Sequence, residues 1–297
     1  MVQDAIDLLA GELGIFILGG AYVTMVLGER LHALFARREY DDGDARCSVA
    51  LNLINSFIGL AVGILLPLGL YILVFENYRL FTIDSLWLAI PAAFVVHELA
   101  YYWEHRLSHR IGLLWAFHTI HHSSNRFNHT TAARGFYFDG LLKGLFALSG
   151  ALAGIDPRVY IAVEIVKNAY GIWNHASYVG HLGVLERVLM TPRNHMVHHA
   201  NQPQYIDRNY GQVLLVWDKL FRSDAPYGER PVVGLVKQVH DNNPLTAQFV
   251  GIRGLLARMG QAERWRDKLA YLWRPPEWSH DGVCRSDCPK YARGAPA

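Results

Sequence analysis

The sequence predicts an all-α fold, a polytopic membrane bundle of about four to five membrane-embedded helices with a helical cap beside the membrane. Two observations support this fold class. Hydrophobic residues make up 52% of the 297 residues and charged residues only 18%, whereas about 25% of the residues in an ordinary soluble domain are charged. The apolar residues also gather in long stretches, one of which, VALNLINSFIGLAVGILLPLGLYILVF at 49–75, contains no charge.

The N-terminal part contains two predicted membrane segments. The apolar segment from Leu13 to Leu27 is short, and residues Ile6 to Leu9 would extend it towards the roughly 20 apolar residues that a span requires. The segment from Val49 to Phe75 is the stronger of the two, and Pro67 permits a kink within it. The N-terminus has no basic leader and no early cleavage site, so we do not expect a removable signal peptide.

The central part contains a third apolar segment and a shorter pair. Leu86 to Trp103 is apolar, although His97 and Glu98 interrupt it, and it ends on aromatic residues of the kind that lie at a membrane boundary. Gly140 to Trp173 is typical of a helical hairpin with an Asp-Pro turn at 156–157. Each arm is shorter than a full span, so the hairpin either crosses and returns or packs on the other helices without crossing.

We divide the chain into N-terminal membrane helices at 1–80, a central domain at 81–225 and a C-terminal cytosolic extension at 226–297. The end of the extension, after about Pro275, is expected to be poorly ordered. Its Cys284 and Cys288 could form a metal clip, but no partner ligands lie nearby in the sequence, which favours two unconnected thiols.

The charges predict the orientation of the cap. Positive residues in short loops favour the cytosolic side of a membrane. Four arginines precede the segment at 49–75, four others surround the central histidines described below, and an even number of crossings separates the two groups. The cap is therefore expected on the cytosolic face. Because the net charge is only +2 and basic residues do not alternate with aromatic ones, nucleic acid is not an expected partner.

Eight of the fifteen histidines lie in three clusters, HRLSH at 105–109, HTIHH at 118–122 and HMVHH at 195–199. Residues three and four apart share one face of a helix, so each cluster can present its imidazoles towards a common centre. His121 and His122 are adjacent and point about 100° apart, so they could bind two different ions or opposite sides of one. At this histidine content, chance would produce an H-x-x-H-H pattern roughly 0.04 times, yet it occurs twice.

The clusters predict a metal centre. Neutral imidazole is the commonest ligand for a borderline transition metal, and eight imidazoles exceed what one tetrahedral site needs and suit two ions. The sequence lacks the H-E-x-x-H motif of a helical zinc protease. The clusters also differ from the mononuclear iron site made of two histidines and one carboxylate. Ligand type alone leaves copper and zinc open.

In order and spacing, the three clusters resemble the histidine boxes of the fatty acid hydroxylase and sterol desaturase superfamily, membrane enzymes with a di-iron centre that use O₂. The similarity covers Glu98 to Phe221 and includes YYWEHRLSHR, LLWAFHTIHHSS, FNHTTAAR and LERVLMTPRNHMVHHA. The later sequence motifs, TPRNHMVHH followed by IDRNYG and WDKLF, are similar to those of the alkylglycerol monooxygenase-like branch.

The resemblance implies hydroxylation or desaturation of a membrane lipid, such as a sterol, fatty acyl or ether lipid, with two iron ions and O₂. The sequence contains no G-x-G-x-x-G nucleotide motif, so electrons would come from a reduced pterin or from a ferredoxin or cytochrome chain. No catalytic side chain is expected beyond the metal centre. His175, in WNHAS, matches a further histidine of the family and completes nine implied ligands: His105, His109, His118, His121, His122, His175, His195, His198 and His199.

Other polar residues could orient these ligands through hydrogen bonds. The candidates are His97, Glu98, Asn194, Asp207 and Asn209. For His97, this role or the lining of a pore is favoured over metal binding. An ordinary structural or surface role is as compatible with the sequence as a ligand-orienting role for the other four, Glu98, Asn194, Asp207 and Asn209. The remaining histidines are assigned to the surface or to the surroundings of the site (His129 and His181) and to the surface alone (His32, His240 and His280).

Two other functions are compatible with a histidine-rich membrane protein. A zinc-dependent membrane hydrolase would contain two zinc ions and need no O₂. A non-catalytic membrane metal transporter would carry ligands along a path through the membrane, whereas these clusters lie beside the predicted spans on one face. We expect the bacterial inner membrane rather than the endoplasmic reticulum as the location.

Overall fold

The computed structural model describes residues 1–59, 65–237 and 241–283. Within these ranges every regular element is a helix, and the loops contain isolated β-bridges at Leu189–Leu214 and Ala200–Val233. The predicted all-α class is therefore confirmed. Two of the described helices, α2 and α5, are long and apolar enough to cross a membrane, which fits a membrane protein. The predicted count of four to five membrane-embedded helices stays a prediction.

The first two helices meet at a sharp turn. Helix α1 spans Val2–Ala10 and α2 spans Glu12–Phe35, with Gly11 in an extended conformation between them. The two helices approach so closely that a Cβ atom at Gly14 would overlap the carbonyl oxygen of Leu9. The prediction that residues 6–9 lengthen the apolar segment is therefore wrong, because they belong to a separate helix. Helix α2 reaches spanning length at its other end instead.

The predicted segment at 49–75 contains parts of two helices. Helix α3 spans Asp42–Gly59, α4 spans Leu66–Tyr78, and residues 60–64 between them lie outside the described part of the chain. Pro67 lies in the first turn of α4, where a helix tolerates proline because the first N–H groups have no partner within the helix. A kink at Pro67 stays a prediction, because residues 60–64 before it lie outside the described part of the chain. The first half of α3 is buried against the cap.

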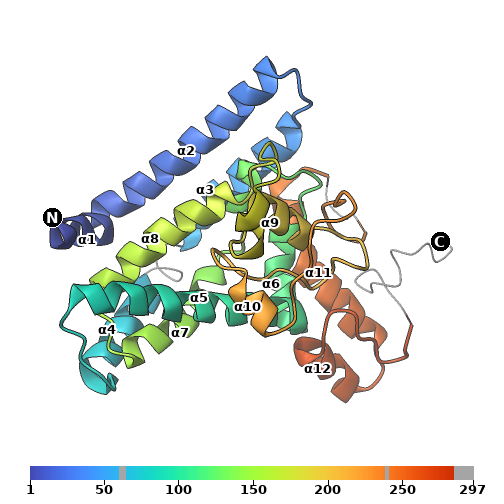
Figure 1. Ribbon diagram of the computed structural model, residues 1–297. Coiled ribbons are helices and arrows are strands. Elements are labelled where there is room, and N and C mark those ends of the chain that lie inside the picture. Colours follow the sequence, from blue (N-terminus) through green and yellow to red (C-terminus); the bar gives the residue numbers. More distant parts are fainter. Residues whose placement is uncertain (60–64, 238–240, 284–297) are drawn as a thin grey trace.

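Helix α5 is the central element of the fold. It runs without interruption over Leu86–Arg110 and so carries the first histidine box at its C-terminal end. Helices α7 (Asp139–Leu152) and α8 (Pro157–Trp173) form the predicted hairpin, and the Asp156 side chain caps α8 by accepting from the N–H of Arg158 at 2.8 Å. Both arms pack against α5. Figure 1 shows α7 and α8 on either side of it.

The cap consists of short helices around the C-terminal ends of α5 and α8 (Figure 1). Helix α6 carries the second histidine box and α9 the third, while α11 and α12 cover the outer side of α6. The elements of the cap are α6 (Gly112–His122), η2 (His129–Ala133), η3 (Gly183–Arg187), α9 (Pro192–His198), α10 (Val216–Leu220), α11 (Pro244–Gln261) and α12 (Trp265–Trp273).

A glycine sets the distance between α6 and α11. A Cβ atom at Gly251 of α11 would overlap the carbonyl oxygen of Ala116 in α6. We therefore expect Gly251→Ala to lower the free energy of unfolding by about 1–3 kcal/mol, the usual cost of overpacking. Thermal unfolding in detergent measures it. Gly260→Ala is the matched control because nothing lies within 4 Å of its Cβ position, and alanine favours helix by up to about 1 kcal/mol. Equal melting temperatures for the two variants would contradict this packing.

Candidate metal centre

The structure brings nine histidines together in two groups inside the cap. Within each group, every residue offers one ring nitrogen, and these atoms lie within 4.8 Å of one another. They are the nine histidines that the sequence singled out. The first group contains His105, His109, His118, His122 and His198, and the second contains His121, His175, His195 and His199.

The second and third boxes each contribute to both groups, in opposite ways. In the second box, on α6, His118 and His122 join the first group, and His121 joins the second. In the third box, at α9, the first and last histidines join the second group, and the middle one, His198, joins the first. Histidines four apart share a helix face, and the residue beside the last one points elsewhere. The H-x-x-H-H spacing thus divides each box between two centres.

The loop after α9 orients the first group. The Nδ1–H of His105 donates to the carbonyl oxygen of Tyr210 at 2.8 Å, and the Nδ1–H of His198 donates to that of Arg208 at 2.8 Å. A carbonyl only accepts hydrogen bonds, so Nδ1 carries the proton and Nε2 keeps a free lone pair. Such contacts fix the tautomer and the ring orientation that a metal ligand needs.

The lone pairs of the first group have no partner in the protein. The Nε2 atoms of its five histidines are buried and accept no hydrogen bond. Each buried polar atom without a partner costs about 1–3 kcal/mol, so five of them converging on one point require an occupant. A cation that accepts lone pairs meets this requirement, and the donor set fits a transition metal.

The ring nitrogens of the second group are also close enough together to bind one metal ion. The Nε2 atom of His195 lies 3.1 Å from Nε2 of His175 and 3.2 Å from Nε2 of His199. These separations are close to the edge of a tetrahedron around a metal with nitrogen ligands at about 2.0–2.1 Å, which is roughly 3.3 Å. The Nδ1–H of His121 donates to the carbonyl oxygen of Arg134 at 3.1 Å. The donor atoms of this group therefore also fit a bound metal.

Burial favours the neutral form of seven imidazoles in the cap. It lowers the pKa of His175 to about 3, and for the six histidines named below neighbouring imidazoles add to the effect of burial. Neutral imidazole is the form that binds a metal. The histidines outside α5 whose pKa lies well below 6.5 are His118, His121, His122, His195, His198 and His199.

Asp207 lies beside the first group. One of its carboxylate oxygens is 3.4 Å from Nδ1 of His109, and the other pairs with the Arg110 guanidinium. Burial raises the pKa of Asp207, but the hydrogen bond from His109 and the charge of Arg110 outweigh it, so the pKa lies below its usual value. The backbone of Asp207 has φ +61°, a left-handed conformation that Asp adopts more readily than most residues. Asp207 is thus placed to orient His109.

Asn194 and Asn209 connect α9 to this loop. The Nδ2 of Asn209 donates to the carbonyl oxygens of Asn194 at 3.0 Å and of Ala225 at 2.9 Å. The Nδ2 of Asn194 donates to the carbonyl oxygens of Glu186 and Leu189. Both amides are therefore buried structural links behind the third box, and their described side-chain contacts are with backbone groups.

His97 and Glu98 contact Lys167 rather than either histidine group. The Glu98 carboxylate lies 2.7 Å from Nζ of Lys167 and accepts from the N–H of Leu214 at 2.8 Å. The Nδ1 of His97 is 2.6 Å from the same Nζ, and its ring lies beside Tyr160. Lys167 could not be identified from the sequence, because nothing local marks one charge within α8 as the partner of another in α5.

His129 is not a surface residue. It is fully buried, its N–H donates to the Glu29 carboxylate at 2.7 Å, and its Nδ1–H donates to the carbonyl oxygen of Ile172 at 3.0 Å. The contact with Glu29 could not be predicted, because nothing in the sequence connects a charged residue near the end of a predicted span with the cap. Of the other histidines and cysteines, His32 and His181 are exposed, His280 contacts Tyr271, and His240, Cys284 and Cys288 lie outside the described residues.

A small open cavity adjoins the first group. His109, His122 and His198 form its inner wall, with Trp115 beside them. Residues 234–236 and 276–277 form the outer wall, so the C-terminal extension contributes to the surroundings of the site. This cavity provides a route from outside the protein to the first group.

The chain was compared with known proteins. Residues 90–223 match the family described as Fatty acid hydroxylase. The chain is 34% identical over 215 residues to alkylglycerol monooxygenase of Danio rerio, which covers 71% of this chain and 48% of that protein. It is 35% identical over 211 residues to alkylglycerol monooxygenase of Homo sapiens, covering 70% and 47% respectively.

A bacterial protein is also similar. Ornithine lipid hydroxylase OlsE of Rhizobium tropici is 32% identical over 186 residues, which covers 62% of this chain and 53% of that protein. The chain thus spans about half the length of the curated relatives it matches, and no solved structure matches it. Residues 90–223 contain all three boxes and His175. The chain therefore belongs to the fatty acid hydroxylase superfamily, on the branch that resembles alkylglycerol monooxygenase.

Proposed function

We propose that this protein is an integral-membrane di-iron oxygenase that hydroxylates or desaturates a lipid with O₂ and external electrons. The observation that carries the proposal is the convergence of five buried Nε2 atoms without partners beside a second group of four histidines. Two groups of neutral imidazoles suit two transition-metal ions. Similarity to proteins named monooxygenase and hydroxylase supports iron and O₂ over hydrolysis.

The protein's own residues have a limited set of tasks in this chemistry. The nine histidines would hold two iron ions, which, when bound, supply the redox chemistry that lets O₂ oxidise an unactivated C–H bond. The carbonyl groups of Tyr210, Arg208 and Arg134 keep Nδ1 protonated and aim Nε2 at the metal. Burial excludes water from the histidine groups. No acid, base or nucleophile of the chain is required beyond the metal centre.

The substrate class follows from the relatives' names, one of which refers to alkylglycerol and the other to ornithine lipid. We propose a membrane lipid that approaches from the bilayer beside α5, with the histidine groups on the cytosolic face. Electrons would come from a reduced pterin or from a ferredoxin or cytochrome chain, and the cavity beside His109 and Trp115 is open to a donor from outside. The relatives include animal and bacterial proteins, and a bacterial inner-membrane location stays a prediction.

The test combines metal analysis with product analysis. The purified protein should contain two iron ions per chain, and cells that express it should form a lipid product that is absent without the gene. Under ¹⁸O₂, a labelled hydroxyl group would identify hydroxylation, and an unlabelled product lacking two hydrogens would identify desaturation. Two zinc ions with turnover that needs no O₂ would favour the hydrolase instead. Metal uptake by vesicles without a lipid product would favour the transporter.

Asp207 gives a specific prediction for the first group. Asp207→Asn keeps the shape of the side chain but removes the charge beside His109 and Arg110. We expect about a 10–100-fold loss of metal affinity at the first group, the usual effect of removing an outer partner of a ligating histidine. Titration of the metal-free protein with Co²⁺ measures it. Asp224→Asn is a charge-matched control, since Asp224 is exposed. Unchanged affinity in Asp207→Asn would show that the carboxylate does not orient His109.

A further inference from the structure

The structure assigns a role in the metal centre to the N-terminal helices. We propose that Asp44 of α3 and Glu29 of α2, which lie outside the family-matched residues 90–223, position the second histidine group. They are positioning residues, because they act through backbone and side-chain groups next to the ligands rather than on the metal. This inference rests on the proposed function, in which the second group holds a metal ion.

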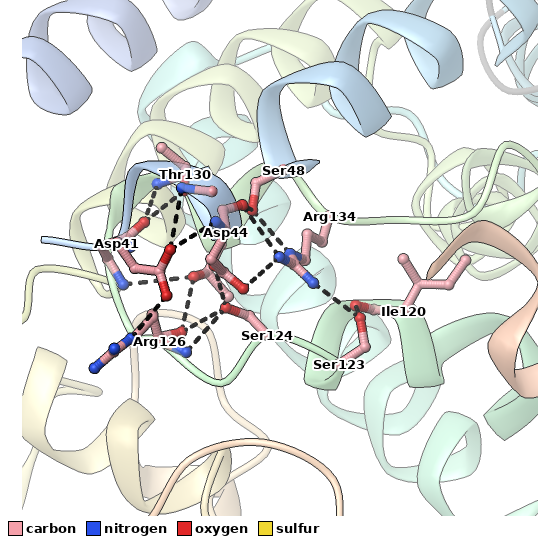
Figure 2. Close-up of polar contacts among 12 residues, drawn as sticks. Asp41, Asp44, Ser48, Ile120, Ser123, Ser124, Arg126, Thr130 and Arg134 are labelled. Atoms are coloured by element: carbon pink, nitrogen blue, oxygen red, sulfur yellow. Dashed lines mark hydrogen bonds and ion pairs between the residues drawn. The ribbon is translucent and has the colours of Figure 1, made fainter. Parts of the chain in front are cut away.

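Asp44 holds Arg134 in a buried network (Figure 2). Asp44 is 1% exposed and Arg134 is 2% exposed, and the Arg134 Nη2 lies 2.7 Å from Oδ1 of Asp44. The same guanidinium donates through Nε to the hydroxyl of Ser48 at 2.8 Å and through Nη1 to that of Ser123 at 3.1 Å. The second carboxylate oxygen of Asp44 accepts from the hydroxyl of Ser124 at 2.7 Å. The contacts with Asp44, Ser48 and Ser123 together hold the Arg134 guanidinium in one position.

The network extends directly to a ligand of the second group. The carbonyl oxygen of Arg134 accepts the Nδ1–H of His121 at 3.1 Å. Ser123 also binds the end of α6, because its hydroxyl donates to the carbonyl oxygen of Ile120 at 2.7 Å. Asp44 therefore fixes both the acceptor for His121 and the helix end that carries it. His121 is the one histidine that α6 gives to the second group.

Glu29 fixes the segment on both sides of His175. Its buried carboxylate accepts from the N–H of His129 at 2.7 Å and from the hydroxyl of Ser177 at 3.0 Å. His129 in turn donates to the carbonyl oxygen of Ile172 at 3.0 Å. Ile172 and Ser177 lie before and after His175 in the chain. Helix α2 is thus connected to the turn that presents His175 to the second group.

The two groups therefore depend on different parts of the chain. In the first group, the described Nδ1 partners lie at 207–210, after the third box. In the second group, His121 and His175 depend on residues held by α3 and α2. A change at Asp44 should consequently weaken the second group more than the first, because only His121 bonds to Arg134, while the helix end is shared with His122. A general loss of stability would instead affect both groups alike.

The experiment uses the full chain in detergent, stripped of metal and titrated with Co²⁺. The wild-type protein should bind two ions, each with its own d–d absorption. Asp44→Asn should lower the affinity of the second site by about 10–100-fold and shift its absorption, while the affinity of the first site falls by less. His121→Ala identifies which signal belongs to the second site, and Asp207→Asn should show the reverse pattern.

The outcomes separate this inference from the function on which it rests. A wild-type protein that binds no metal overturns the proposed function. A folded Asp44→Asn protein that keeps both sites, or loses both equally, overturns the positioning role. Should Asp44→Asn fail to fold, Arg134→Lys replaces it: lysine keeps the charge beside Asp44 but lacks the planar fork that reaches Ser48 and Ser123 together. A selective loss at the second site is again expected, and an unchanged second site again contradicts the proposal.

Discussion

Replacing His121 by alanine is expected to deplete one metal site and replacing His122 the other, although the two residues are adjacent. His121 belongs to the second group and His122 to the first. A ligand contributes more than its outer partners, whose loss costs about 10–100-fold, so each variant should lose at least about 100-fold in turnover. Metal content per chain and the rate of lipid oxidation measure the two effects. Each variant should keep the metal of the site that it does not supply.

His129→Ala is the control for this pair of variants. His129 is as deeply buried as the ligands, but it belongs to neither group and contacts Glu29 and Ile172. Because His129 also links Glu29 to the segment that carries His175, the variant should still bind two ions per chain, with a weaker affinity at the second site only. Loss of the same metal signal in His121→Ala and His122→Ala would contradict the division of the second box. Complete loss of an ion from His129→Ala at saturating metal, at a temperature where the protein is folded, would show that His129 is a ligand.

The grouping of the histidines was accessible from the sequence because it depends on local geometry. Within a helix, the spacing alone decides which side chains share a face, so the separation of His121 from His122 could be anticipated. The position of His175 beside His195 could not be obtained from spacing, because the two residues are 20 positions apart and a turn lies between them. It was implied by the resemblance to the superfamily, and the structure places the two Nε2 atoms 3.1 Å apart.

The partners of the ligands could not be predicted, because tertiary packing brings them from distant segments. Asp44 and Arg134 are 90 positions apart, and Glu29 and Ser177 are 148 apart. In the sequence, Asp44 belongs to an acidic cluster that suggests solvent exposure, yet the side chain is buried because Arg134 neutralises it. For the fold, apolar stretches indicated α2, α5, α7 and α8, whereas the stretch at 49–75 contains parts of two helices. Composition did not reveal that α3 begins at Asp42, within the cap.

The second large effect concerns pH. For the metal-free protein, we expect a steep loss of stability as the pH falls from about 6.5 to 5. The reason is that burial lowers the pKa of the imidazoles in the folded cap, whereas in the unfolded chain they titrate near 6.5. Below pH 6.5 the unfolded chain therefore binds more protons than the folded one, and acid favours unfolding. The contributing residues outside α5 are His118, His121, His122, His175, His195, His198 and His199.

The size of the effect follows from the number of protons. Each imidazole that is protonated only in the unfolded chain contributes about 1.4 kcal/mol per pH unit, so seven contribute on the order of 10 kcal/mol per unit. A folded domain has only about 5–15 kcal/mol of stability, and unfolding should be complete within about 1–2 units. Urea unfolding of chelator-treated protein in detergent, followed between pH 7.5 and 4.5, tests this expectation. Stability that stays constant over that range would contradict it.

A single substitution distinguishes the histidine groups from a general effect of acid. His118→Gln removes one buried titrating group, so the dependence of stability on pH should become shallower by about 1.4 kcal/mol per unit. His181→Gln should leave the slope unchanged, because that side chain is 62% exposed. Bound metal should move the transition to lower pH, since a coordinated imidazole must release the ion before it accepts a proton. The shift between metal-free and metal-loaded protein then measures the affinity of the two groups directly, independently of catalysis.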